Sequence, residues 1–200
     1  MPASALDDGP APRAALLPVA DAAALTAAYR AYRGPLVRYA CRITGDLAAA
    51  HDVVQDVFVK VWETHEALVV RSSFSALLYT MTRNRALNDH RRHARIAAGV
   101  DVEDADGEAA FLSGAPDTPE TALEADELGR HLRRGIDALP PRRAEAFTLS
   151  RFHALSHAEI AGVMGLSVRT VDTHVVHALR DLRAHLDALY RGPAGPPPAP

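Results

Sequence analysis

The chain contains 200 residues, of which 48% are hydrophobic and 24% charged, and its formal net charge at pH 7 is −3. This composition is typical of a folded globular protein and excludes wholesale disorder. No apolar run approaches the roughly 20 residues of a membrane-spanning helix, and residues 1–20 lack the basic start and apolar centre of a signal peptide, so we expect a cytoplasmic protein. Cys41 is the single cysteine, which excludes an internal disulfide and a zinc-thiolate cluster, and we expect it to be buried.

Charge is distributed unevenly along the chain. Residues 21–95 hold 11 basic and 7 acidic residues, and residues 128–191 hold 10 basic and 6 acidic residues. Residues 96–127 hold ten acidic residues and no lysine or arginine. This acidic stretch also contains glycines and prolines that break regular structure, so it predicts a linker between two mildly basic domains.

We therefore predict a first domain over residues 21–97, a flexible acidic linker over 98–126 and a second domain over 127–190. The linker is either a solvated spacer that its charge keeps extended or a segment that imitates nucleic acid or lies in a basic channel. The two ends of the chain, residues 1–20 and 191–200, are rich in alanine and proline and are predicted to be disordered.

The first domain shows apolar residues at helical spacing, which predicts three or four helices and no strand. Gly45 should end the first helix and Asp46 should cap the second. Apolar positions three and four apart predict two buried stripes: Leu25, Tyr29, Tyr32, Leu36, Tyr39 and Ile43 in the first helix, and Val53, Val54, Val57, Phe58, Val61 and Trp62 in the second. The polar face of the second helix is either a solvated surface or a docking patch, and it carries Asp52, Gln55, Asp56 and Lys60.

The segment from Phe74 to Arg95 is apolar at its start and rich in arginine and asparagine later. Such a helix can pack at one end while its other end contacts phosphates and base edges of nucleic acid. Basic residues near a helix C-terminus also complement the helix dipole, which is the simpler explanation of the same pattern.

The second domain contains the most specific pattern, between Leu155 and Leu182. Ser156 and Glu159 form a predicted capping box, Gly165 should stop that helix in a left-handed conformation, and Ser167 should cap the following helix. Two short capped helices joined by a tight turn predict a helix-turn-helix, and a purely structural helical hairpin is the alternative. The predicted inward residues are Ile160, Ala161 and Met164 in the first helix and Val168, Val171, Val175, Leu179 and Leu182 in the second.

The second helix of this pair would present its N-terminal half to the major groove. The candidates for base or phosphate contact are Arg169, Thr170, Thr173, His174 and His177. Asp172 on the same surface repels phosphate unless it accepts a hydrogen bond from cytosine or pairs with Arg169. The histidines of this region have no cysteine beside them, so we expect no metal and no cofactor.

Taken together, these motifs resemble the extracytoplasmic-function (ECF) sigma factors of bacterial RNA polymerase, in the sigma-70 family. The resemblance runs from about residue 21 to 190. It rests on three stretches in order: Ala50–Trp62, then Leu78–Asn84 with Asp89–Arg92, and finally Leu139–Leu182. It implies an all-α protein of two small helical domains that binds core RNA polymerase at its clamp and flap, reads the promoter −10 and −35 elements, and is masked by an anti-sigma factor.

The resemblance also assigns candidate residues. The polymerase contacts would be Asp52, Val53, Gln55, Asp56, Phe58 and Trp62. The −10 contacts would be Arg83, Asn84, Asn88, Arg91 and Arg92, with the loop from Leu68 to Ser73 capturing a flipped base, and the −35 contacts would be the five candidates of the second domain. The linker would run towards the basic RNA-exit path of the polymerase.

The sequence departs from the family at Leu77, where an aromatic residue is usual, and at Asp172 and His177, where many members carry lysine or arginine. The shortage of positive charge predicts weak DNA binding by the free protein. No catalytic constellation is present, so we expect a transcription initiation factor and not an enzyme. Two alternatives remain: a dimeric helix-turn-helix regulator that binds an operator without polymerase, and a sigma-like decoy that binds polymerase but starts no transcripts.

Overall fold

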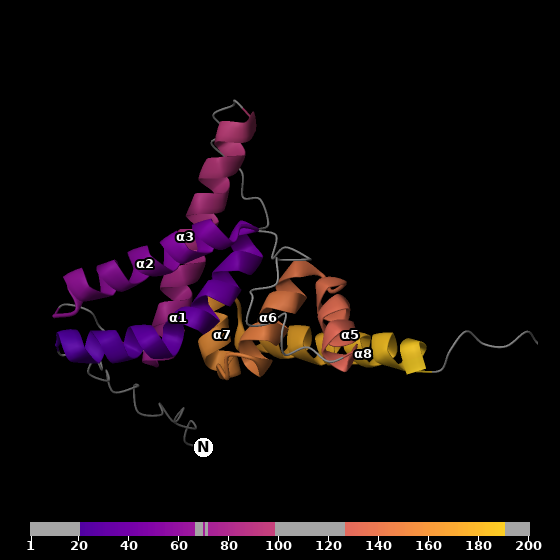
Figure 1. Ribbon diagram of the computed structural model, residues 1–200. Coiled ribbons are helices and arrows are strands. Elements are labelled where there is room, and N and C mark those ends of the chain that lie inside the picture. The colour runs from indigo at the N-terminus through magenta and orange to yellow at the C-terminus, as the bar shows by residue number, and fades with distance from the viewer. Residues whose placement is uncertain (1–20, 67–69, 71, 99–126, 191–200) are drawn as a thin grey trace, which may run out of the picture.

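Seven helices and no strand make up the part of the chain that the computed structural model describes, residues 21–66, 70, 72–98 and 127–190. They form two groups (Figure 1). The first group contains α1 (Ala22–Thr44), α2 (Leu47–Thr64) and α3 (Phe74–Ala98), and the second contains α5 (Glu127–Asp137), α6 (Pro141–Arg151), α7 (His157–Met164) and α8 (Val168–Tyr190). The all-α prediction is confirmed. The predicted linker beyond Ala98 and both predicted disordered ends lie outside the described residues.

Local chemistry sets the helix boundaries of the first group. A carboxylate oxygen of Asp21 accepts a hydrogen bond from the amide of Ala24 at 2.7 Å, and Asp46 does the same for Ala49 at 2.7 Å, so each carboxylate satisfies an amide that the first helical turn leaves unpaired. Gly45 has φ of 74°, a left-handed conformation that glycine adopts without strain, and it ends α1. The predictions for Gly45 and Asp46 are confirmed.

The core of the first group forms where α1, α2 and α3 meet. Its largest fully buried side chains include Leu36, Tyr39, Leu78 and Tyr79, and Cys41 is buried as expected. The stripe predicted on α2 is buried except at one position: Trp62 is 40% exposed and stacks on His65 with ring centroids 4.9 Å apart. The prediction of a core Trp62 was therefore wrong, because Trp62 lies about 100° round the helix from the fully buried Val61 and falls outside the inward stripe.

In the second group, α7 and α8 form the predicted helix-turn-helix. Ser156 and Glu159 make the reciprocal capping box, Gly165 has φ of 67°, and the hydroxyl of Ser167 accepts a hydrogen bond from the amide of Thr170 at 3.1 Å. Each of these predicted caps is confirmed. The predicted inward residues of α7 are also buried, namely Ile160, Ala161 and Met164.

The inward stripe of α8 differs from the prediction at two positions. Val171, Val175 and Leu182 are buried, but Val168 and Leu179 are exposed. Ala178, fully buried, takes the inward place that was expected for Leu179, which lies one position, or about 100°, further round the helix. Val168 is the first residue of α8 and lies beyond the packed part of the helix.

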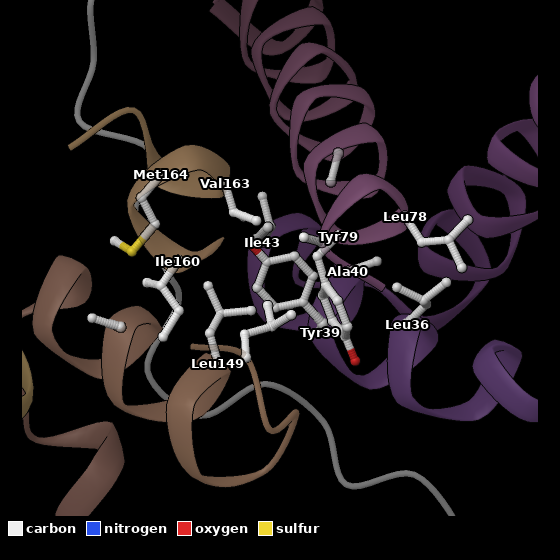
Figure 2. Close-up of a cluster of buried hydrophobic side chains, with 14 of the residues drawn as sticks. Leu36, Tyr39, Ala40, Ile43, Leu78, Tyr79, Leu149, Ile160, Val163 and Met164 are labelled. Carbon is white, nitrogen blue, oxygen red and sulfur yellow. The ribbon is translucent and has the colours of Figure 1, made fainter. Parts of the chain in front are cut away.

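The two groups share one continuous core. Tyr39 and Ile43 of α1 and Tyr79 of α3 lie beside Leu149 of α6 and Ile160 and Val163 of α7 (Figure 2). All of these side chains are buried. The sequence pattern predicts two helical units, and the structure shows them closed against each other.

Candidate nucleic-acid and partner interfaces

The predicted polymerase-binding residues lie on two different sides of α2. Asp52, Gln55 and Asp56 are exposed, whereas Val53 and Phe58 are buried with only 1% and 5% of their surface exposed. A direct contact of Val53 or Phe58 with another protein is incompatible with this burial, so that part of the prediction is corrected: both side chains shape the helix from inside the core. Trp62 and its exposed neighbour Val59 add an apolar surface near the C-terminal end of α2.

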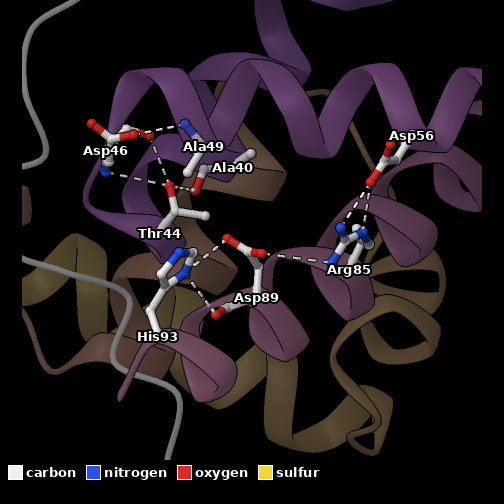
Figure 3. A network of polar contacts seen from close by, with 8 residues as sticks. All are labelled: Ala40, Thr44, Asp46, Ala49, Asp56, Arg85, Asp89 and His93. Carbon is white, nitrogen blue, oxygen red and sulfur yellow. Dashed lines mark hydrogen bonds and ion pairs between the residues drawn. The ribbon is translucent and has the colours of Figure 1, made fainter. Parts of the chain in front are cut away.

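A groove between α2 and α3 joins the polar face of α2 to the arginine-rich part of α3. Its lining includes Asp52, Gln55 and Asp56 on one side and Arg85, Asp89 and Arg92 on the other. Arg85 bridges the groove, since its Nε donates to Asp56 at 2.9 Å and its Nη1 lies 3.7 Å from an Oδ1 of Asp89 (Figure 3). His93 contacts the same Asp89 at 3.2 Å.

Arg85 and Asp89 were not among the candidate site residues. Their spacing of four positions on one helix is a recognisable signal for an ion pair. The contact of Arg85 with Asp56 joins residues 29 positions apart, and no local pattern reveals it.

The predicted −10 residues of α3 fall into two environments. Asn84, Asn88 and Arg92 are exposed and Arg91 is half-buried. The side chain of Arg83 is only 16% exposed, and its Nε donates to Oε1 of Glu145 in α6 at 2.8 Å. The base-capture loop predicted over Leu68–Ser73 lies partly outside the described residues; of its described members, Val70 is buried and Ser73 caps α3 by accepting from the amide of Ala76 at 3.1 Å.

Glu145 is the centre of a buried polar cluster between the two helical groups. Its carboxylate accepts hydrogen bonds from Arg83 and from the hydroxyl of Tyr39, the latter at 2.7 Å. Burial raises the pKa of Tyr39 well above its usual value and the negative charge of Glu145 raises it further, so the tyrosine stays a hydrogen-bond donor. Burial lowers the pKa of Arg83, but the hydrogen bond and charge of Glu145 outweigh this and raise it overall. The cluster thus joins Glu145 to one charged donor, Arg83, and one neutral donor, Tyr39.

Two further polar contacts cross the same interface. Nη2 of Arg42 donates to Asp137 at 2.8 Å, and the hydroxyl of Tyr79 lies 2.7 Å from Nδ1 of His153. Burial, followed by the nearby charge of Arg38, lowers the pKa of His153 to about 4, so this imidazole is neutral at pH 7.

The predicted −35 residues lie together along the N-terminal half of α8. Arg169 and Thr173 are exposed, and Thr170, His174 and His177 are partly exposed. Burial lowers the pKa of His174, and the positive charges of Arg143 and Arg142 on α6 lower it further. Those two arginines were not among the candidates, because only the packing of α6 against α8 brings them to this surface.

Asp172, the acidic residue on the recognition surface, is paired with His157 of α7 and not with Arg169. The pair ties the first helix of the helix-turn-helix to the second across its outer side. In the parts of the chain that the structure describes, no three His, Cys, Asp or Glu side chains come together in a metal-binding arrangement. None of the described helices is both long and apolar enough to span a membrane.

The two helical groups correspond to two conserved family models: residues 28–96 match Sigma-70 region 2 and residues 130–182 match Sigma-70, region 4. Over 177 residues the chain is 34% identical to the ECF RNA polymerase sigma factor SigL of Mycobacterium tuberculosis, with 85% of this chain and 93% of SigL covered. The chain belongs to the ECF RNA polymerase sigma factors. It is a promoter-recognising sigma factor for core RNA polymerase.

Further relatives agree with this assignment. This sigma factor is 29% identical over 143 residues to the ECF RNA polymerase sigma-E factor of Escherichia coli, covering 70% of this chain and 75% of that one. Its fold is similar to that of the sigma factor RpoE from Bartonella quintana, solved in complex with the anti-sigma factor NepR, with a TM-score of 0.57, 19% identity and coverage of 82% and 96%. It is also similar to CnrH, solved with the cytosolic domain of CnrY, with a TM-score of 0.53, 24% identity and coverage of 85% and 92%.

Proposed function

We propose that this sigma factor reads the −10 element with the outer face of α3, reads the −35 element with the N-terminal half of α8, and docks on core polymerase through the polar and apolar surface of α2. One observation carries the proposal: the exposed candidates of each set lie together on one helix, the α2 and α3 sets on the two sides of one groove and the α8 set on the other helical group. Because the three sets occupy different helices, one chain can hold polymerase and two promoter elements at the same time.

On α3, the exposed amides of Asn84 and Asn88 are one helical turn apart and can hydrogen-bond base edges in an opened strand. Arg91 and Arg92 follow one turn later and suit the flanking phosphates. Holding bases outside the stack costs a few kcal/mol, which contacts of this kind offset. Arg83 belongs to the same helix and becomes available to DNA when its contact with Glu145 is broken.

On α8, Arg169 at the start of the helix suits a bidentate contact with guanine or a phosphate. Thr173 and His177 follow on the same face at intervals of four. Burial, followed by the charges of Arg143 and Arg142, lowers the pKa of His174 and keeps it neutral, so it reads a base edge or accepts a hydrogen bond and adds no charge. Few positive charges lie on this surface, which supports an affinity that depends on polymerase for most of its strength.

On α2, Asp52, Gln55 and Asp56 offer acceptors to a basic partner surface, and Val59 and Trp62 offer an apolar anchor beside them. We place the boundaries of the two functional domains at residues 21–97 and 127–190, with 98–126 as the linker. The protein acts as a binding factor without catalytic chemistry of its own, in the cytoplasm where polymerase meets the promoter. Its similarity in fold to the sigma factor RpoE, solved with the anti-sigma factor NepR, supports an anti-sigma factor for this chain as well.

The test is transcription with purified core polymerase and genomic DNA fragments, followed by sequencing of the 5′ ends that depend on the added chain. We expect a shared pair of upstream elements. His177→Ala should then relax selection at the upstream element and Asn88→Ala at the downstream one. Binding to core without any new 5′ ends would contradict the proposal, and so would operator binding that needs no polymerase.

A further inference from the structure

The contact between Arg83 and Glu145 joins a candidate promoter-binding side chain to the opposite helical group. Arg83 belongs to α3 and Glu145 to α6, 62 positions apart. The guanidinium directs its Nε and Nη2 hydrogens at Glu145 and the Arg83 side chain is only 16% exposed, so it cannot reach a DNA phosphate or base while this contact holds. Closure of the two groups and use of Arg83 on DNA therefore exclude each other.

We infer that Glu145 is an internal gate on promoter binding, which holds Arg83 and keeps the two helical groups closed until polymerase separates them. The inference rests on the proposed −10 role of Arg83. The carboxylate of Glu145 and a phosphate of DNA compete for the same guanidinium, because both are anionic acceptors of its hydrogen bonds.

The buried surroundings of Glu145 make the closed arrangement of the two helical groups depend on its hydrogen bonds. Its side chain is only 4% exposed, so its charge is removed from water and depends on Arg83 and Tyr39 for compensation. Loss of either partner leaves a buried carboxylate insufficiently paired, which disfavours the closed arrangement. The ion pair thus couples the pairing of Arg83 to the position of the whole second group.

A second contact places the helix-turn-helix over the start of α3. Burial raises the pKa of the Glu159 carboxyl, which completes the capping box of α7, but the nearby hydroxyl of Ser73, the residue that caps α3, helps to lower it overall, and α3 and α7 are in contact. Ser73 ends the loop proposed to capture a flipped base. The closed arrangement therefore covers α3 at two points, Ser73 and Arg83, while Asn84, Asn88 and Arg92 stay exposed.

The test measures closure and DNA binding separately in the full-length chain. Fluorophores on cysteines introduced at exposed Ala31 and Ala184, in a Cys41→Ala background, report the distance between the groups.

Glu145→Gln keeps the shape of the side chain and removes its charge. We expect it to shift the equilibrium towards the open form by about tenfold, the usual effect of losing a charged hydrogen bond. Tyr39→Phe, which removes only the donor hydroxyl, should open the groups in the same direction without disturbing the core. Glu63→Gln, an exposed carboxylate paired with Lys60, is the matched control and should leave the distance unchanged.

Affinity for a short single-stranded DNA oligonucleotide is then measured without polymerase. Since the apparent affinity scales with the open fraction, Glu145→Gln should tighten binding by up to about tenfold. Arg83→Ala should also open the groups, because it leaves Glu145 without its charged partner. It should not tighten DNA binding, because it removes the arginine that is proposed to contact DNA. Equal gains for both variants would overturn the gate, as would a Glu145→Gln protein that stays closed. Failure of the wild-type chain to start transcripts with polymerase would instead overturn the proposed function, since the distance measurement uses no DNA.

Discussion

The hydroxyl of Tyr79 lies 2.7 Å from Nδ1 of His153, and the two rings are tilted by 39° with their centroids 4.7 Å apart. Tyr79 belongs to α3, and His153 follows α6, so this contact crosses the interface between the helical groups. Burial raises the pKa of Tyr79, which keeps the phenol protonated as a donor to the neutral imidazole. A protonated His153 would lose this acceptor atom and carry an uncompensated charge near Arg38.

The interface should weaken in mild acid. The pKa of His153 is lowered by burial from 6.5 to about 4, so the closed form binds a proton more weakly than the open form. The contribution of the neutral ring is complete above pH 6.5 and is lost progressively as the pH falls from 6.5 to about 4, by up to about 3 kcal/mol. Interdomain distance measured against pH should show opening over this range in the wild type. The dependence should be reduced in His153→Phe, and an unchanged profile in that variant would contradict the assignment.

Substitution of alanine for Gly135 and for Gly162 should have opposite effects on folding stability. A Cβ at Gly135 of α5 would lie 2.9 Å from Cδ2 of Leu182 and 3.0 Å from Cδ2 of His185, and Leu182 is buried and cannot move freely. A Cβ at Gly162 of α7 would meet no atom within 4 Å. Gly162→Ala should therefore stabilise the protein by roughly 0.5–1 kcal/mol through helix propensity, and Gly135→Ala should lose that gain to an overpacking cost of about 1–3 kcal/mol. Thermal unfolding of the two variants checks the contrast, which equal shifts would refute.

Substitutions at Trp62 and Phe58 should distinguish an effect on polymerase binding from an effect on folding stability. Phe58 is buried against Tyr29, with ring centroids 5.1 Å apart, so Phe58→Ala should cost about 3–5 kcal/mol of folding stability. Trp62→Ala removes an exposed ring and should cost little stability while weakening the binding of core polymerase. Denaturant unfolding and a polymerase pull-down measure the two effects. A large stability loss for Trp62→Ala with unchanged polymerase binding would reverse the assignment.

Asp172→Asn should strengthen promoter binding. The exposed carboxylate lies on the side of α8 that we propose to face DNA, where it would repel phosphates, and its partner His157 neutralises it only when the imidazole is protonated. The substitution should raise promoter affinity of the polymerase complex severalfold at low salt, with less gain as salt increases. Asp187→Asn, further along α8, is the control. Weaker binding by Asp172→Asn would show that the carboxylate accepts a hydrogen bond from a base.

Arg91→Ala with Arg92→Ala should lower transcription without weakening the binding of core polymerase. Arg92 is exposed at the groove that α3 forms with α2, and Arg91 beside it is half-buried. Loss of two phosphate contacts should also reduce the salt dependence of promoter binding. The comparison is with Asp52→Ala and Asp56→Ala, which should weaken core binding. An equal loss of core binding in the arginine variant would contradict the assignment of Arg91 and Arg92 to DNA binding.

The helix ends were predictable from the sequence because each depends on residues within a few positions of one another. Gly45, Asp46 and Gly165 are examples in which one side chain, or its absence, decides the local backbone. Apolar spacing located most of the core but erred at the edge of a stripe, as at Trp62 beside the buried Val61, or where a small alanine takes the inward place, as beside Leu179.

The contacts of Glu145 could not be predicted in this way. A glutamate in an arginine-rich helix is typical of a solvated surface, and its two partners lie 62 and 106 positions away. Candidate surface residues were equally ambiguous: Val53 and Phe58 lie in the same stretch as Asp52 and Asp56, and only the packing of α2 shows which of them reach the surface.

The buried carboxylate of Glu145 also restricts how this sigma factor can be recombined. A chimaera that fuses residues 127–190 to the first domain of another sigma factor would carry Glu145 to a surface without Tyr39 and Arg83 unless that domain supplies equivalent donors. Both halves could fold, yet they would not close, because the carboxylate would be buried without compensation. The two helical groups are therefore matched to each other through this carboxylate and its donors. Exchange of the second group between paralogues should succeed only where residues equivalent to Tyr39 and Arg83 are present in the first.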